Sequence, residues 1–94
     1  MTATARIMWN PDMQSGIMMA MDMPELSGDE TYQLWFLRGG VPVSAGTFNI
    51  DTTGMGMLEM NDMPIGDYEV AAITAEPSGG SPAPTGTILI AGEL

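Results

Sequence analysis

Methionine is the residue type that stands out in this chain, with eleven among 94 residues. Met19, Met21 and Met23 alternate along one segment, and Met55 and Met57 repeat the spacing in another. Residues two apart on a β-strand share a face, so each segment could present its thioether sulfurs as a row. Thioethers are soft ligands that suit Cu(I) and, by the same chemistry, Ag(I). The spacing therefore indicates a soft-metal site as an alternative, although the sequence favours methionine as an adaptable core filler.

Carboxylates are the only plentiful titratable groups. Asp22 and Glu25 lie close in sequence to Asp29 and Glu30, in one polar segment. A carboxylate hydrolase needs two such groups held about 5–10 Å apart across a cleft. A domain of 94 residues leaves little room for such a cleft. We therefore favour a solvated acidic loop, and a small hydrolase that uses Asp29 or Glu30 stays as an alternative.

The chain contains no cysteine and no histidine. Disulfides, thiolate nucleophiles, thiolate zinc sites and histidine-based catalytic triads are therefore excluded. We expect no cofactor and no enzymatic activity. Twelve acidic residues against Arg6 and Arg38 give a formal net charge of −10. A field of that sign repels phosphate backbones, so nucleic acid is not an expected partner.

The elements that must position these side chains are short strands. The chain holds 12 glycines and 7 prolines, and no apolar stretch keeps a helical period over eleven or more residues. Recurrent turn signals between short apolar segments predict a single all-β domain over residues 1–94, an antiparallel immunoglobulin-like β-sandwich of about seven strands. The predicted strands are residues 4–9, 17–21, 31–38, 42–48, 55–60, 68–75 and 87–91.

Two features refine this prediction. Both faces of residues 31–38 are largely apolar, which predicts a central strand. Trp35 on that strand is expected to be the buried tryptophan of the immunoglobulin-like class. Ile65, Gly66 and Tyr68 follow the pattern of a tyrosine corner, in which the hydroxyl of Tyr68 would bind upstream backbone. The alternative is that Tyr68 simply begins a strand of another β fold.

Residues 76–86 form a long connection rich in glycine and proline. Such a loop is longer than a hairpin requires, and binding residues on sandwiches often lie in loops. We expect a shaped loop that packs across the sandwich or contacts a partner, with Trp35 and Tyr32 anchoring the core beneath it. A flexible spacer is the alternative.

Two blocks of sequence occur in a recognisable order. The first is YQLW at 32–35, followed by PVSAGTF at 42–48, and the second is AITAEPSGGSP at 72–82, followed by PTG at 84–86. Together they resemble the C-terminal domain of the anti-sigma-K factor family over about residues 5–92. The residues that carry this resemblance are Tyr32, Gln33, Leu34, Trp35, Glu76, Pro77, Gly79, Gly80, Pro82, Pro84, Thr85 and Gly86.

The resemblance implies a non-catalytic sensor or regulatory β-sandwich on the extracytoplasmic side, tethered by an upstream transmembrane helix outside this sequence. It implies that the full-length protein holds an extracytoplasmic-function sigma factor through an N-terminal region that this chain lacks. Release would proceed by regulated proteolysis, with a site-1-type protease or a regulatory protein as partner. Weak self-association stays open. The sequence departs from the family pattern at Thr87, where proline is common, and in its many methionines.

Overall fold

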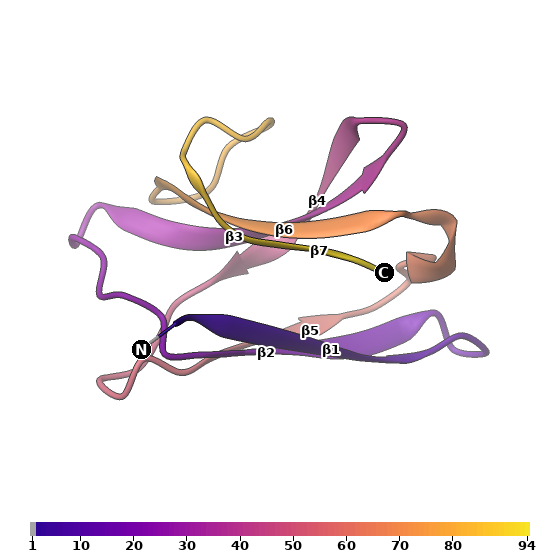
Figure 1. Cartoon of the computed structure of the whole chain (residues 1–94), viewed down its shortest axis with the longest axis horizontal. Helices are drawn as coiled ribbons and strands as arrows, with labels where there is room; N and C mark the ends of the chain where they lie inside the picture. The colour runs from indigo at the N-terminus through magenta and orange to yellow at the C-terminus, as the bar shows by residue number, and fades with distance from the viewer. Residues whose placement is uncertain (1) are drawn as a thin grey trace.

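Two antiparallel sheets packed face to face make up the computed structural model, which describes residues 2–94 (Figure 1). One sheet has the strand order β1-β2-β5 and the other has the order β4-β3-β6-β7. The chain therefore alternates between the sheets, and the predicted all-β sandwich is confirmed. The strands are β1 (Thr4–Asn10), β2 (Ser15–Met21), β3 (Glu30–Arg38), β4 (Val41–Phe48), β5 (Gly56–Met60), β6 (Val70–Pro77) and β7 (Ile88–Glu93).

The interior of the sandwich is built on β3, which lies between β4 and β6. Tyr32, Leu34 and Phe36 alternate along it and are each no more than 1% exposed. They belong to one apolar cluster with Met18 of the opposite sheet. Burial of a side chain of this size stabilises the fold by about 1.5–3 kcal/mol. The remaining buried members of the cluster are Ala20, Met23, Phe48, Met60, Ile65 and Ile73.

A two-residue turn fixes the register between β3 and β4. Arg38 pairs with Val41, so Gly39 and Gly40 alone make the reversal. Both glycines have positive φ, +57° and +79°, as a type I′ hairpin turn requires. Pro42 lies at the start of β4, the edge strand of this sheet, where a missing N–H is tolerated.

The predicted boundary of the sixth strand is wrong at both ends. Strand β6 begins at Val70, after a short 3₁₀ helix η1 (Ile65–Asp67), and it runs on to Pro77. Glu30 at the start of β3 pairs with Pro77, so the ladder continues through residues that were expected to be loop. Glu76 is therefore a strand residue, and the loop proper begins at residue 78.

The predicted tyrosine corner is also wrong in its hydrogen bond. The ring of Tyr68 stacks on that of Phe36, with centroids 5.6 Å apart, and its hydroxyl has no hydrogen bond within residues 2–94. A different tyrosine makes the bond back to upstream backbone: the hydroxyl of Tyr32 donates to the carbonyl oxygen of Pro24 at 2.5 Å. The sequence pattern identified the turn before β6 but not the tyrosine that binds backbone.

Within residues 2–94, no helix has the length and apolar character needed to cross a bilayer.

Candidate functional site

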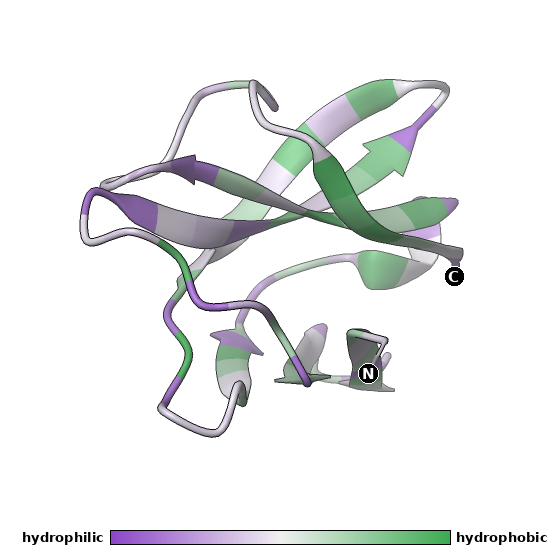
Figure 2. Cartoon of the chain, turned by 60° about the vertical axis from the view of Figure 1, so that its left-hand side comes forward, coloured by the Kyte–Doolittle hydropathy of each residue, from purple (hydrophilic) through white to green (hydrophobic). Residues whose placement is uncertain are grey.

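The outer face of the four-stranded sheet carries a second buried region. Trp35 alternates with the interior residues Leu34 and Phe36, so its side chain points away from the other sheet, yet it is fully buried. Gln33 and Thr74 on the same face are 3% and 1% exposed. The connection between β6 and β7 arches over this face of the sheet (Figure 2), and Gln33 is hydrogen-bonded to Ser81 of this connection. Trp35 is therefore buried, as expected, but on the outer face of the sheet and not between the two sheets.

A chain of hydrogen bonds links Trp35 to this loop. The indole Nε1 of Trp35 donates to Oγ1 of Thr74 at 2.9 Å, and Thr74 donates in turn to Oε2 of Glu76. Glu76 also accepts from the hydroxyl of Thr85 and from the backbone N–H groups of Thr85 and Gly86, each of the latter at 3.2 Å. One buried carboxylate thus ties the strand to the returning end of the loop.

The electrostatics of Glu76 follow from these bonds. Burial by itself would raise the pKa of its carboxyl, because the charged form loses solvation. Hydrogen bonds from Thr74, Thr85 and the Gly86 N–H outweigh that effect and lower the pKa from 4.5 to about 2. Glu76 is therefore a stabilised anion at neutral pH, the opposite of a general acid.

Gln33 holds the middle of the loop. Its Oε1 accepts from the backbone N–H of Ser81 at 2.9 Å, and its Nε2 donates to the carbonyl of the same residue at 3.1 Å. The same Nε2 donates to Oγ of Ser44 on β4 at 2.7 Å. At the start of the loop, the N–H of Ser78 donates to the carbonyl of Asp29. The loop is therefore fixed at three points, which supports a shaped loop over a flexible spacer.

Gly86 allows the loop to return close to the sheet. A Cβ at this position would lie 1.9 Å from the carbonyl oxygen of Ala75. No side chain fits at that distance, so the approach that brings Thr85 and Gly86 to Glu76 requires glycine.

The motif residues fall into two groups, those that take part in the hydrogen bonds described above and those that do not. One group comes from both sequence blocks and takes part in the hydrogen bonds on the outer face of the four-stranded sheet, which we call the outer network. Its members are Gln33, Trp35, Glu76, Thr85 and Gly86. Sequence reasoning did not single out Thr74, although it lies two residues before Glu76 and so shares its face. Tyr32 and Leu34 point into the interior, so the expectation that Tyr32 lies beneath the loop is wrong. The remaining motif residues lie nearer the surface: Gly80 is half-buried, and the exposed ones are Pro77, Gly79, Pro82 and Pro84.

The acidic segment before β3 does not form a hydrolase pair. Asp29 and Glu30 are both exposed, and both accept from the hydroxyl of Ser27, at 2.7 and 2.8 Å. The bond from Ser27 lowers the pKa of Asp29, whereas a general acid needs a raised one. No cluster of three or more acidic side chains within residues 2–94 is arranged to hold a metal ion.

The methionines named as thioether ligands do not all share one face. Met19 of β2 pairs directly with Met57 of β5, on the outer face of the three-stranded sheet. Met21, Met55 and Met57 are 39%, 42% and 58% exposed. Met23 is 4% exposed and belongs to the interior cluster, so the prediction that it shares one face with Met19 and Met21 is wrong. The chain turns at Asp22, where φ is +57°, and this breaks the alternation after Met21.

Comparison with known proteins gives one consistent result. Residues 1–88 match the family described as "Anti-sigma-K factor rskA, C-terminal". The anti-sigma-K factor RskA of Mycobacterium ulcerans (strain Agy99) is 34% identical over 87 residues, and that of Mycobacterium tuberculosis (strain ATCC 25618 / H37Rv) is 35% identical over 88. Each alignment covers 92% of this chain but 37% of the relative, so the chain spans little more than a third of their length. No solved structure matches significantly.

Proposed function

The chain belongs to the family of the C-terminal region of anti-sigma-K factor RskA, and on that premise we propose that it is the regulatory domain of a longer anti-sigma factor. In this proposal, a region of the full-length protein outside this sequence binds the sigma factor. The domain lies on the extracytoplasmic side of a membrane span and acts without catalysis. Its state governs whether a site-1-type protease releases the sigma factor.

The observation that carries the proposal is the convergence of the two motif blocks on one buried network. Gln33 and Trp35 come from the first block, and Glu76 and Thr85 come from the second. Each hydrogen bond to Glu76 comes from the chain's own groups, so this carboxylate holds a loop in place. We propose that this loop has a released state besides the attached one, as a regulatory element requires.

The net charge of the domain agrees with action by protein contact. A formal charge of −10 opposes binding to nucleic acid and to anionic lipid. The loop offers exposed residues around Pro82 and Pro84, where another protein could reach it. We propose that the attached loop limits access for the protease or its regulator.

A reporter gene driven by the cognate sigma factor tests this function in cells. Full-length protein should keep reporter expression low, and deletion of residues 78–82 should change both reporter expression and the amount of cleaved protein on an immunoblot. A Glu25→Gln variant, altered at an exposed carboxylate, serves as the control and should behave as wild type. Unchanged sigma-factor release in the deletion variant would count against a regulatory loop.

A soft-metal module is the second candidate function, and the cross-strand pair of Met19 and Met57 favours it. Met21 and Met55 are also exposed, in or beside these strands. Arg6 of β1 pairs with Met19, and its positive charge disfavours the binding of a metal cation there. Anaerobic titration with Ag(I), followed by native mass spectrometry, should show a stoichiometric complex that a double Met19→Leu, Met57→Leu variant loses. Absence of any complex would remove this candidate.

A further inference from the structure

The sandwich is closed along one side and open along the other. On the closed side, Leu58 of β5 packs against β4, where a Cβ on Gly46 would lie 3.2 Å from its side chain. On the other side, β1 and β7 are the edge strands of their sheets. Figure 1 shows both strands on the side nearest the viewer. A cleft of about 650 Å³ opens there between the sheets.

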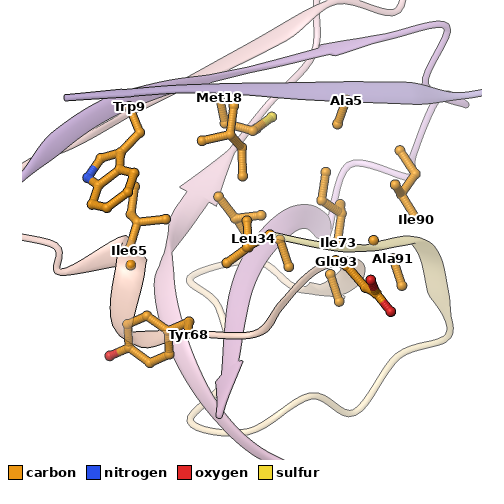
Figure 3. Close-up of a pocket in the computed structure, with 16 residues that line it drawn as sticks. Ala5, Trp9, Met18, Leu34, Ile65, Tyr68, Ile73, Ile90, Ala91 and Glu93 are labelled. Atoms are coloured by element: carbon orange, nitrogen blue, oxygen red, sulfur yellow. The ribbon is translucent and has the colours of Figure 1, made fainter. Parts of the chain in front are cut away.

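The cleft is apolar and reaches the interior. Figure 3 shows Met18 projecting from one sheet and Leu34 and Ile73 from the other, with Ile90 of β7 at one side. Trp9 of β1, 38% exposed, forms one end. Its indole ring packs closely on Gly66, where a Cβ would lie only 2.7 Å from the ring. Such a volume suits a few apolar side chains of a ligand.

Three of the four sheet edges carry a proline or a charged side chain before their last residue, which discourages pairing with another strand. Edge strand β4 has Pro42 and a register shift opposite Leu34 and Trp35. Edge strand β5 is five residues long and carries Glu59, and edge strand β1 carries Arg6.

Edge strand β7 carries its one charge, Glu93, at its last residue, and its pairing with β6 shifts register once, between Ile73 and Thr74. Its first five residues, which read ILIAG, hold neither proline nor a charged side chain. Ile88 and Leu89 are 56% and 36% exposed, and Figure 2 shows the hydrophobic colouring continuing along this strand. Among residues 2–94, no backbone hydrogen bond is made to the outer edge of β7. The same strand therefore combines a free hydrogen-bonding edge with the border of the apolar cleft.

We propose that β7 and the cleft bind an extended peptide segment of another protein, which adds a strand to the four-stranded sheet. Backbone hydrogen bonds to β7 would hold the segment, and its alternate side chains would enter the cleft beside Trp9 and Ile90. The segment is apolar at alternate positions and basic elsewhere, since the domain carries a charge of −10 and Glu93 lies beside the cleft. The same charge disfavours a second copy of this chain, because both would be strongly acidic.

A labelled peptide probe tests this proposal directly. The probe is an acetylated and amidated heptapeptide of sequence KVTVTVK, whose valines share one face when it is extended. We expect saturable binding by fluorescence anisotropy with a Kd below about 1 mM. Amide chemical-shift changes in the ¹⁵N spectrum should concentrate on residues 88–93 and around Trp9. The same peptide N-methylated at its five central residues cannot pair as a strand and should not bind.

A matched pair of variants distinguishes binding at the β7 edge from general electrostatic attraction between the basic probe and the acidic domain. Ala91→Lys places a cation on β7, and Val43→Lys makes the same charge change on β4, the opposite edge of the same sheet. Both sites are exposed. Ala91→Lys should weaken probe binding at least about tenfold, while Val43→Lys should leave it nearly unchanged.

Three results would overturn the proposal. The first is the absence of saturable binding, and the second is an equal loss in both lysine variants, which would show unspecific charge attraction. The third is concentration-dependent dimerisation that Ala91→Lys abolishes, because it would assign the edge to a second copy of the chain. Sedimentation velocity without the probe measures that last case.

Discussion

Glu76 shows how one side chain can hold a loop. It is 1% exposed, yet its carboxylate is stabilised because Thr74, Thr85 and Gly86 all donate hydrogen bonds to it. Hydrogen bonds to a charged group are roughly twice as strong as neutral ones. The attachment of the loop therefore depends on the charge of this residue.

Replacement of Glu76 by glutamine should lower the free energy of unfolding by about 1.5–3 kcal/mol at pH 7, because the charge-assisted bonds are lost. The pKa of Glu76 is lowered from 4.5 to about 2 in the fold. Its contribution is therefore complete above the unfolded pKa of about 4.5 and is lost as the pH falls through the folded value near 2. Urea unfolding of both proteins at pH 7 and pH 3 measures the difference, which should shrink at the lower pH.

The exposed residue Glu25 provides the control for that experiment. A Glu25→Gln variant should unfold like the wild type at both pH values. If Glu76→Gln were equally stable at pH 7, the hydrogen bonds to this carboxylate would not hold the loop.

Gly86→Ala tests the close approach between the loop and β6. The added methyl group would lie 1.9 Å from the carbonyl of Ala75, so the returning chain must move away from the sheet. We expect destabilisation of about 1–3 kcal/mol, the usual cost of overpacking. Gly92→Ala is the matched control, because a Cβ there meets nothing within 4 Å. Thermal unfolding measures the stability of both variants. Equal midpoints for Gly86→Ala and Gly92→Ala would contradict the packing argument.

At the scale of the elements, the loop and the outer face of the four-stranded sheet depend on each other. Gln33 binds Ser81 through both atoms of its amide group, so it fixes the middle of the loop over Trp35. Gln33→Ala should loosen this region while Glu76 still holds the far end.

Acrylamide quenching measures the effect of Gln33→Ala, in a Trp9→Phe background where Trp35 is the one tryptophan left. Quenching should increase in the Gln33 variant, because water and quencher gain access to a ring that is fully buried in the wild type. Thr52→Ala, at an exposed turn, should leave quenching unchanged. A Trp35 that stays equally protected in both variants would show that the loop covers it without help from Gln33.

The strands could be predicted from the sequence because turn residues mark their ends. Gly39 and Gly40, for example, define the β3–β4 hairpin without any tertiary information. The outer network could not be predicted, because the apolar pattern of residues 31–38 shows that both faces are buried but not which partner covers each. The strand assignment of Glu76 was missed because a charged residue beside proline resembles a loop, and two of its three donor residues, Thr85 and Gly86, lie nine and ten residues away.

At the scale of the whole molecule, the three-stranded sheet has one buried and one exposed methionine face. Mild hydrogen peroxide should therefore oxidise the exposed thioethers and spare the interior ones, because oxidation follows access. Peptide mass spectrometry should find sulfoxide first at Met8, Met13, Met55 and Met57, while Met18, Met23 and Met60 stay reduced. The urea-unfolded chain should lose this selectivity. Oxidation of Met60 as fast as Met57 in the folded protein would contradict the assignment of faces.

The four-stranded sheet separates two buried regions, and this has a consequence for how the molecule opens. The interior cluster around Leu34 and Phe36 stabilises the sandwich, whereas the outer network holds only residues 78–87 to its surface. We expect these regions to open as two cooperative units with different opening free energies. The outer unit can detach while the inner one stays folded, so a brief excursion from the native state exposes Trp35 and the loop ends without global unfolding. Under the proposed function, such an excursion would give the protease a cleavable substrate, and the hydrogen bonds to Glu76 would set its population.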